Sequence, residues 1–566
     1  MQKVFRILVL MSIVFFVSQI KAAKAQTYCN PLILSNQVNG NKPAIHDVSD
    51  PSVILYKDNY YLFASKSKAY WYSNDLLSWK SVTNSNIPLK NNCPTAVVIG
   101  EWLYFFTSYT DTIFRSNDPA SGKWEVYNSK FLLSMITDPA VFADTDGRVY
   151  CYYGCTNDNR LMARELDVNN KLNPKGVPEV CLRKNPFEEV SKRSGDKTAQ
   201  PTNRSAEGSW VCKYNGKYYY QSSEPGFAFK SYNDVVYVAD KPLGPYTYAS
   251  NNPISSKPGG FISGASRGST FADKYGNWWH IATMSVKQSE TRLGLFPAGF
   301  DDEGNLFVNT DFGDYPIVMP NYKYNNISEL NPAWSLLSYD KKAEASSSSA
   351  SNSSANAFDE NIETYWCPQN GKKNEWLSVD LGSLCTINAF QLNFSENNIK
   401  LLEGEGAIAH QYLVEYSADK KNWKTLSDKT SNKEDLSHPY EAMKNPVQAQ
   451  YVKITNHLIS DGTFAISGFR IFGSGTNSKP TKLTTFYASR DFRDQRMIKL
   501  TWVKKEYVTG YMIRYGTKKD KLHQSYQVFK DAPVTFRVLD KNKTYWFEID
   551  AFDENGVTPS DPHPSH

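Results

Sequence analysis

Histidine is scarce in this chain: its 566 residues include eight, and no two of them form an H-E-x-x-H pair. A zinc hydrolase of that type is therefore not expected. Long apolar runs are also missing after the N-terminal segment, which disfavours a membrane-spanning protein. The first half of the chain has no long apolar period of 3.6 residues, which disfavours an α/β fold.

The one apolar run belongs to a targeting segment. Lys3 and Arg6 precede the apolar residues 7–17, and Ala23-Lys-Ala25 before Gln26 has the form of a cleavage site. We expect residues 1–25 to be a signal peptide of an exported protein (periplasmic, cell-surface or secreted), with an uncleaved anchor as the alternative. The formal charge of +5 falls to +1 without the four basic residues of this segment, so charge does not indicate a nucleic-acid partner.

The eight cysteines do not form the framework of a small disulfide scaffold. Cys151 and Cys155 flank a Tyr-Tyr-Gly strand, and no histidine stands at zinc spacing from them. Two alternatives stay open: buried free thiols, or one or two bridges, which export permits. We predict no metal site from these residues.

Aromatic residues are abundant, with 36 Tyr, 30 Phe and 13 Trp. In residues 28–326 they recur in one unit, a tight turn followed by an aromatic strand. The copies are DNYYLFAS from Asp58, GEWLYFFTS from Gly100, DGRVYCYYG from Asp146, NGKYYYQSS from Asn215 and YGNWWHIAT from Tyr275. Such turns predict hairpins, and a spacing of roughly 40 to 70 residues is typical of propeller blades with loop insertions. We predict a five-bladed β-propeller over residues 26–330.

Charged residues recur at one level of this unit. Each lies ten or eleven residues before the position at which the aromatic strand begins after its turn. The pairs are Asp50 and Tyr60, ten apart, and, eleven apart, Asp138 and Val149, Glu207 and Tyr218, and Arg267 and Trp278. If these strands are the innermost of their blades, the four side chains point at one end of the central axis. Converging carboxylates are costly unless paired or functional, and two acids with different pKa values are what glycoside hydrolysis uses. The alternative is that Asp-Pro simply marks strand-entry turns.

At these residues the region resembles glycoside hydrolase family 43, the inverting five-bladed propeller enzymes. The resemblance covers about 300 residues. The matching segments are SDPSVILYKDNYYLFAS, SNDLLSW, TDPAVFADTDGRVYCYYG, SAEGSWVCKYNGKYYYQSS, DKPLGPY and RLGLFPAGFDDEGNL.

The resemblance implies a role for each matched residue. Asp50 matches the general base that deprotonates water, Asp138 the pKa modulator and Glu207 the general acid. It also implies a base and an acid roughly 6.5–9.5 Å apart and no required cofactor. Arg292 and Arg267 are the substrate-binding candidates; for Arg292, a solvated or salt-bridged arginine is the alternative.

Three local patterns depart from the family or resemble another one. Many members have Gly-His-Gly near the fifth blade, where this chain has Arg267; an arginine does not ligate a cation, so an axial calcium site is not expected. The frequent Trp-Ala-Pro of the second blade reads Asn92-Cys93-Pro94. Ser266 lies in a G-x-S-x-G match, but a strand, a turn and a strand follow, which does not fit a serine hydrolase.

The second half resembles two β-sandwich domains joined to the propeller by a polar linker. Residues 331–475 resemble the discoidin (coagulation factor type C) domain through NAFD, TYW and WLSVDLG, after a tract whose composition is low-complexity serine. The domain is expected to bind carbohydrate or to act as a spacer. Residues 478–566 resemble fibronectin type III, with Trp502 in the core and a tyrosine corner at Leu539 and Tyr545.

The sequence thus predicts an all-β protein: a five-bladed β-propeller, a discoidin-like β-sandwich and a fibronectin type III-like β-sandwich. We expect an exported, inverting exo-glycosidase that releases terminal sugars from oligo- or polysaccharides and acts as a monomer. An α-L-arabinofuranosidase is favoured, with a β-xylosidase or exo-β-galactosidase as alternatives. From other classes, a non-catalytic glycan-binding protein or an adhesin remains open. A structural calcium ion is compatible with the discoidin-like domain.

Overall fold

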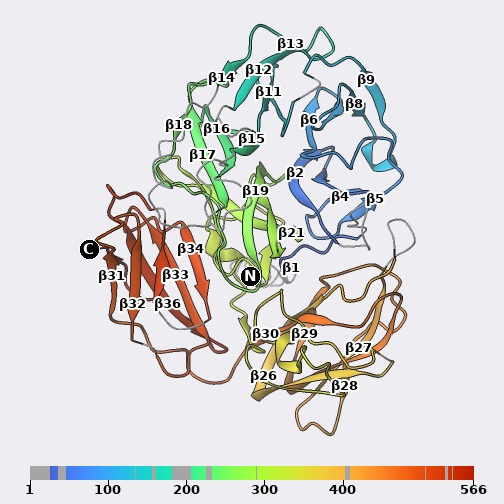
Figure 1. Ribbon diagram of the computed structural model, residues 1–566, viewed down its shortest axis with the longest axis vertical. Helices are drawn as coiled ribbons and strands as arrows, with labels where there is room; N and C mark the ends of the chain where they lie inside the picture. The colour runs from blue at the N-terminus through green and yellow to red at the C-terminus, as the bar shows by residue number, and fades with distance from the viewer. Residues whose placement is uncertain are drawn as a thin grey trace, which may run out of the picture.

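The computed structural model describes residues 26–35, 46–133, 136–155, 161–180, 206–224, 232–287, 290–371, 373–401, 408–503, 505–529, 533–537 and 539–565. These residues form strands and three short 3-10 helices (Figure 1). None of the helices in this part is long and apolar enough to cross a membrane. The predicted signal peptide and Cys181 lie outside the described residues.

The N-terminal half is built from five antiparallel sheets, one per blade, each with four strands in chain order; a fifth strand of the third blade pairs with the third strand of that blade. Blade one contains β2 (Ser49–Tyr56), β3 (Asn59–Ser65), β4 (Tyr70–Ser73) and β5 (Lys80–Val82). Blade two contains β6 (Thr95–Ile99), β7 (Trp102–Phe106), β8 (Ile113–Ser116) and β9 (Glu125–Asn128), with helix η2 (Pro119–Ser121). Blade three contains β10 (Ala140–Ala143), β11 (Val149–Tyr153), β12 (Met162–Asp167), β13 (Asn173–Pro174) and β14 (Glu179–Val180). Blades four and five contain β15 (Glu207–Tyr214), β16 (Lys217–Glu224), β17 (Asn233–Ala239) and β18 (Thr247–Tyr248); and β19 (Ser263–Ala272), β20 (Trp278–Lys287), β21 (Glu290–Phe300) and β22 (Leu306–Val308).

The first strands of the blades form a closed ring around the central axis (Figure 1). β2 contacts β6, β6 contacts β10, β10 contacts β15, β15 contacts β19, and β19 contacts β2. The predicted five-bladed propeller is therefore confirmed, and its innermost strands are those that the hairpin order predicts. A short pair outside the blades, β1 (Gln26–Tyr28) with β23 (Ile317–Met319), joins the two ends of this domain.

The aromatic strands pack blade against blade. Phe63 of the first blade lies 5.4 Å from Phe105 and 6.1 Å from Trp124 of the second blade, centroid to centroid. In the same way Tyr152 of the third blade meets Tyr220 of the fourth at 5.5 Å. Tilted and edge-to-face contacts of this kind stabilise a core beyond the area that they bury. These rings therefore serve packing, and they are not available as sugar platforms.

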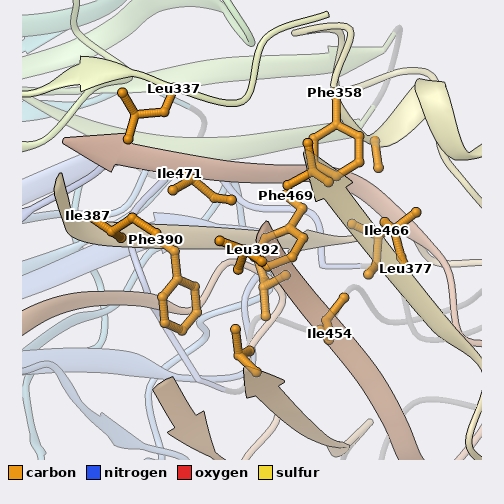
Figure 2. Close-up of a cluster of buried hydrophobic side chains, with 14 of the residues drawn as sticks. Leu337, Phe358, Leu377, Ile387, Phe390, Leu392, Ile454, Ile466, Phe469 and Ile471 are labelled. Carbon is orange, nitrogen blue, oxygen red and sulfur yellow. The ribbon is translucent and has the colours of Figure 1, made fainter. Parts of the chain in front are cut away.

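The second domain is one sheet folded over a single apolar core, a β-sandwich. Helix η3 (Ile327–Leu330), just before it, still packs on the propeller core beside β23. The elements of the second domain are β24 (Ser335–Leu336), β25 (Lys342–Ala345), η4 (Ser354–Ala357), β26 (Trp376–Phe394), β27 (His410–Ser417), β28 (Lys424–Asp428), β29 (Tyr440–Ile459) and β30 (Ile466–Ser474). Figure 2 shows its core, where Phe390, Phe469 and Ile471 meet side chains from several strands. The register shifts in β26 let this long strand bend around that core.

The serine tract is an ordered part of the sandwich, unlike the low-complexity segment that its composition predicts. Ser347 Oγ donates to Glu375 Oε2 at 2.9 Å, and the Ser347 carbonyl accepts from the indole of Trp366 at 3.0 Å. Trp366 is fully buried in the core. A serine hydroxyl and a serine carbonyl thus satisfy polar groups of Glu375 and Trp366, which composition alone does not reveal.

The third domain is a sandwich of two sheets, one of three strands and one of five. Its strands are β31 (Phe486–Arg490), β32 (Ile498–Trp502), β33 (Gly510–Gly516), β34 (Gln524–Val528), β35 (Val534–Phe536), β36 (Trp546–Asp553), β37 (Gly556–Thr558) and β38 (His563–Pro564). The Tyr545 hydroxyl accepts a hydrogen bond from the upstream backbone N–H of Asp540 at 3.2 Å, as a tyrosine corner does. The assignment to fibronectin type III stays a prediction.

Buried charges join the sandwich to the propeller. Arg470 of the sandwich binds Glu360 through two hydrogen bonds of 2.9 and 2.8 Å and lies 3.6 Å from Asp314 of the propeller. A second cluster surrounds His46 of the propeller, whose Nε2 lies 2.8 Å from Asp435 Oδ1 of the sandwich. The other ring nitrogen, Nδ1, contacts Glu396 Oε1.

The His46 cluster predicts a pH-dependent stability. Burial would lower the pKa of His46, but the Asp435 and Glu396 carboxylates outweigh it and raise the pKa to about 10. The stabilisation is therefore complete below the unfolded pKa of about 6.5 and is lost as the pH rises towards 10. We expect His46→Gln to lower the melting temperature strongly at pH 6 and much less at pH 10, as calorimetry would show. An equal effect at both pH values would contradict a charged His46.

Candidate active site

The structure brings Asp50, Asp138, Glu207 and Arg267 together at one end of the ring. Each lies at or just before the start of an innermost strand or, for Arg267, at an irregularity within it. Register shifts also interrupt β2 and β15 beside Asp50 and Glu207. Such bulges change the direction of side chains, and they are frequent next to active sites. The spacing argument from the hairpins is confirmed for all four positions.

Several of these residues have a backbone that side chains rarely adopt. φ is +53° at Asp50, +48° at Asp138 and +49° at Arg267. Cys93, which opens the second blade, has φ of +50°. Left-handed conformations of non-glycine residues cost of order 1–3 kcal/mol and persist where the surroundings fix them. These conformations must therefore be held by neighbouring groups.

Hydroxyl groups of the preceding blade hold these strained residues. Each accepts a hydrogen bond from a backbone N–H of the next blade. The pairs are Thr283 Oγ1 with Asp50 N at 3.0 Å, Ser65 Oγ with Cys93 N at 2.6 Å, Ser108 Oγ with Asp138 N at 3.0 Å, and Ser223 Oγ with Arg267 N at 2.9 Å. In the third blade Cys155 follows the second strand, and its thiol donates instead to Glu207 Oε2 at 3.3 Å.

Arg267 is the centre of the site, because its guanidinium contacts all three acids. Nε lies 2.6 Å from Asp50 Oδ1, in a close ion contact that lacks hydrogen-bond geometry. Nη2 donates to Asp138 Oδ2 at 2.8 Å, and Nη1 lies 3.2 Å from Glu207 Oε2. Burial disfavours the charge of Arg267, but Asp50 and the other acids outweigh it and raise the pKa of the guanidinium. The positive charge that compensates the three acids therefore comes from the Arg267 side chain.

Two neutral donors complete the surroundings of the acids. The Tyr232 hydroxyl donates to Glu207 Oε1 at 2.9 Å, and the Cys93 thiol donates to Asp138 Oδ1 at 2.9 Å. Burial raises the pKa of Cys155 to about 12, and the negative charges of Asp138 and Glu207 add to this effect. Cys155 is therefore a thiol at neutral pH. Since a tyrosine hydroxyl can donate or accept, Tyr232 can pair with Glu207 in both of its protonation states.

Cys93 occupies the same level of the second blade, and the spacing argument missed it. It lies ten residues before Leu103, as Asp50 lies ten before Tyr60, and a proline follows both. A search for charged residues passes over a thiol, although the count alone would have found it.

One group of possible metal ligands lies here, among the residues that the structure describes. The ligand atoms of Asp138, Cys155 and Glu207 are within 4.8 Å of one another. Arg267 already contacts two of these three residues, so its guanidinium compensates their charge.

Cys155 is exposed and the other six described cysteines are buried, and all seven are free, which favours the free-thiol alternative.

Arg292 does not join the acids. It is 2% exposed, and Nη2 lies 3.0 Å from Glu290 Oε1 while Nε donates to His438 Nε2 of the sandwich at 2.8 Å. Its contacts therefore favour the salt-bridged alternative over a substrate contact. Ser266 of the G-x-S-x-G match lies inside β19 and is buried, so it is not exposed on a sharp strand-to-helix turn.

Comparisons with known proteins find matches for both the propeller and the sandwich. Residues 42–294 match the model of glycosyl hydrolases family 43, and residues 342–467 match the F5/8 type C domain. A protein named beta-xylosidase from Xylanibacter ruminicola is 32% identical over 192 residues, which cover 30% of this chain and 56% of that protein. An arabinoxylan arabinofuranohydrolase from Paenibacillus polymyxa is 25% identical over 247 residues, covering 41% of this chain and 37% of that protein.

A solved structure described as a thermostable family-43 glycoside hydrolase is 22% identical, with a TM-score of 0.43. The match covers 52% of this chain and 100% of that one. The chain spans about half or less of the length of the two curated relatives.

Proposed function

We propose that this chain, whose residues 42–294 match the model of glycosyl hydrolases family 43, is an inverting exo-glycosidase acting on xylan-type polysaccharides. Asp50 is the general base that takes a proton from the attacking water. Glu207 is the general acid that protonates the leaving oxygen, and Asp138 orients and tunes Glu207. Arg267 is the residue that neutralises the three acids and contacts the bound sugar.

The observation that carries the proposal is the single guanidinium between Asp50 and Glu207. Asp50 Oδ1 and Glu207 Oε2 contact different nitrogens of Arg267, at 2.6 and 3.2 Å, so one guanidinium group bridges the two carboxylates. Inverting hydrolysis needs an acid and a base far enough apart, roughly 6.5–9.5 Å, to admit a water beside the sugar. A gap that holds a guanidinium group supports this arrangement.

For the sugar we favour a terminal α-L-arabinofuranose, with β-xylose as the nearest alternative and β-galactose as a third. The two curated relatives are named for the first two of these activities. A second class, a propeller that binds glycans or acts as an adhesin without cleaving them, draws support from Arg267 because the three acids are already ion-paired.

A substrate panel tests the proposal. The full-length protein is incubated with nitrophenyl α-L-arabinofuranoside, β-xyloside and β-galactoside, and with arabinoxylan and xylo-oligosaccharides. We expect release of one terminal sugar, and NMR of the first-formed anomer is expected to show inversion. A retained anomer excludes the water-attack geometry, and absence of cleavage on the whole panel favours the glycan-binding protein.

Tyr109 is expected to contact the substrate beyond the terminal sugar. It follows Ser108, which holds Asp138; it is 58% exposed with φ of +58°, and its N–H donates to Ile136 O at 3.1 Å. An aromatic contact contributes about 0.5–1.5 kcal/mol, so Tyr109→Ala should raise KM for oligosaccharides about two- to tenfold. The KM for nitrophenyl glycosides should not change. Tyr275→Ala, an exposed tyrosine in a turn at the other end of the fifth blade, is the control; equal effects would remove Tyr109 from the substrate path.

Three further expectations belong to this proposal: export, a monomeric state and a structural calcium ion in the sandwich. Within its described part the sandwich has no group of three His, Cys, Asp or Glu side chains that converges on one point. Asp359 accepts hydrogen bonds from Asn361 N and Thr364 Oγ1 at 3.0 and 2.6 Å. The structural calcium ion in the sandwich stays a proposal.

A further inference from the structure

The segment that leads into Asp50 is held by the F5/8 type C sandwich. The backbone N–H of His46 donates to Glu396 Oε1 at 2.8 Å, and its ring is held between Glu396 and Asp435. Glu396 follows the end of β26, and Asp435 precedes β29. His46 is 2% exposed and Asp435 5% exposed. Burying charges is costly unless they are paired, and here both partners of the propeller histidine belong to another domain.

Arg292 closes the cluster from the propeller side. It donates from Nη1 to the His46 carbonyl, and its Nη2 lies 3.5 Å from Glu396 Oε1. His438 of the sandwich accepts from Arg292 Nε, so its Nδ1 carries the proton and donates to Asn393 Oδ1 at 2.7 Å. Burial lowers the pKa of His438 well below its ordinary value, in accord with a neutral ring that accepts. The sandwich therefore contacts both the His46 segment and β21.

The contacts continue from His46 to Asp50. Asp47 Oδ1 accepts from the N–H and the hydroxyl of Thr291 at 2.9 and 2.6 Å, and the oxygen of the same hydroxyl lies 2.8 Å from Val48 O. Asp50 lies two residues after Val48, and its backbone N–H donates to Thr283 Oγ1 at 3.0 Å. A residue with φ of +53° keeps that conformation when its flanks are fixed. One flank of Asp50 is thus anchored, four residues away, by carboxylates of the sandwich.

We propose that the F5/8 type C domain is a positioning domain for the base: Glu396 and Asp435 hold His46 and thereby set the place of Asp50. The inference rests on the proposed function, since it assigns Asp50 the role of base. Glu396 and Asp435 are positioning residues and do not touch the substrate. A misplacement of about 1 Å far from the chemistry can cost up to about 10²-fold in rate.

The test uses Glu396→Gln and Asp435→Asn in the full-length protein. Each should lower kcat about 10- to 100-fold with little change in KM, since the sugar-binding groups stay in place. The acid limb of the kcat/KM profile, which reports the base, should shift. The matched control is Asp311→Asn, which breaks the ion pair with Arg514 between the propeller and the third domain. It should lower the melting temperature without changing kcat.

Two outcomes separate failure of this inference from failure of the proposed function. If the wild type is active and the two variants keep its kcat and pH profile, the sandwich is a spacer and the inference is wrong. If the wild type cleaves nothing, hydrogen exchange of residues 46–56 decides. Faster exchange in Glu396→Gln than in Asp311→Asn supports the positioning role, and equal exchange overturns it.

Discussion

Glu207→Gln and Asp50→Asn are each expected to lower kcat/KM by at least about 10²–10⁴-fold on whichever glycoside the wild type cleaves. The two losses should depend differently on the leaving group. In the proposed roles, a natural linkage leaves as an alkoxide that needs the proton of Glu207, whereas nitrophenolate leaves without one. Glu207→Gln should therefore lose more activity on oligosaccharides than on nitrophenyl glycosides. Asp50→Asn should lose similar activity on both, because water attacks in either case.

Glu224→Gln is the matched control for this pair. Glu224 is a buried carboxylate at the end of β16 in the same blade as Glu207, and it accepts from the Tyr237 hydroxyl at 2.8 Å. Its contacts with the propeller core predict an effect on the melting temperature and activity close to that of the wild type. If the control loses as much activity as Glu207→Gln, or if neither Asp50→Asn nor Glu207→Gln does, the assignment of acid and base is wrong.

The level of the site residues could be predicted because antiparallel pairing turns sequence distance into position. Glu207 pairs with Ser223 across the hairpin whose turn contains Asn215 and Gly216. Counting back from a turn therefore reaches the same end of each innermost strand. The count also predicts the place of Arg267. It does not predict that the guanidinium contacts every acid, because the direction of the side chain depends on the bulge at Ser266.

The contacts between domains could not be predicted from the sequence. Arg292 meets Glu396 across 104 positions and His438 across 146, and no local pattern records such pairs. The resemblance therefore suggested a substrate contact for an arginine that the sandwich in fact covers. The serine tract shows the same limit, because its order depends on Glu375 and Trp366, which lie beyond it in the chain.

Arg267→Met is expected to cause the largest loss of stability in the propeller. Asp138 and Glu207 are 6% and 4% exposed, and in the described part of the chain Arg267 is the cation that contacts both. Methionine keeps much of the volume and removes the charge. Breaking a buried ion pair by removing one partner costs about 3–5 kcal/mol, because the remaining charge stays buried without compensation. Chemical denaturation should show a loss of this size, and activity should fall as the acids lose the group that spaces them.

A double variant distinguishes this charge effect from a packing defect. Adding Asp138→Asn to Arg267→Met removes one of the converging carboxylates and should restore part of the stability, although Asp138→Asn alone lowers it. The effect of Asp138→Asn on stability should therefore change sign between the wild type and the Arg267→Met background. A double-mutant cycle measures this coupling, which is expected for residues in direct contact. Losses that simply add would mean that the guanidinium contributes through its shape, and a fully stable Arg267→Met would contradict the convergence of the three acids on it.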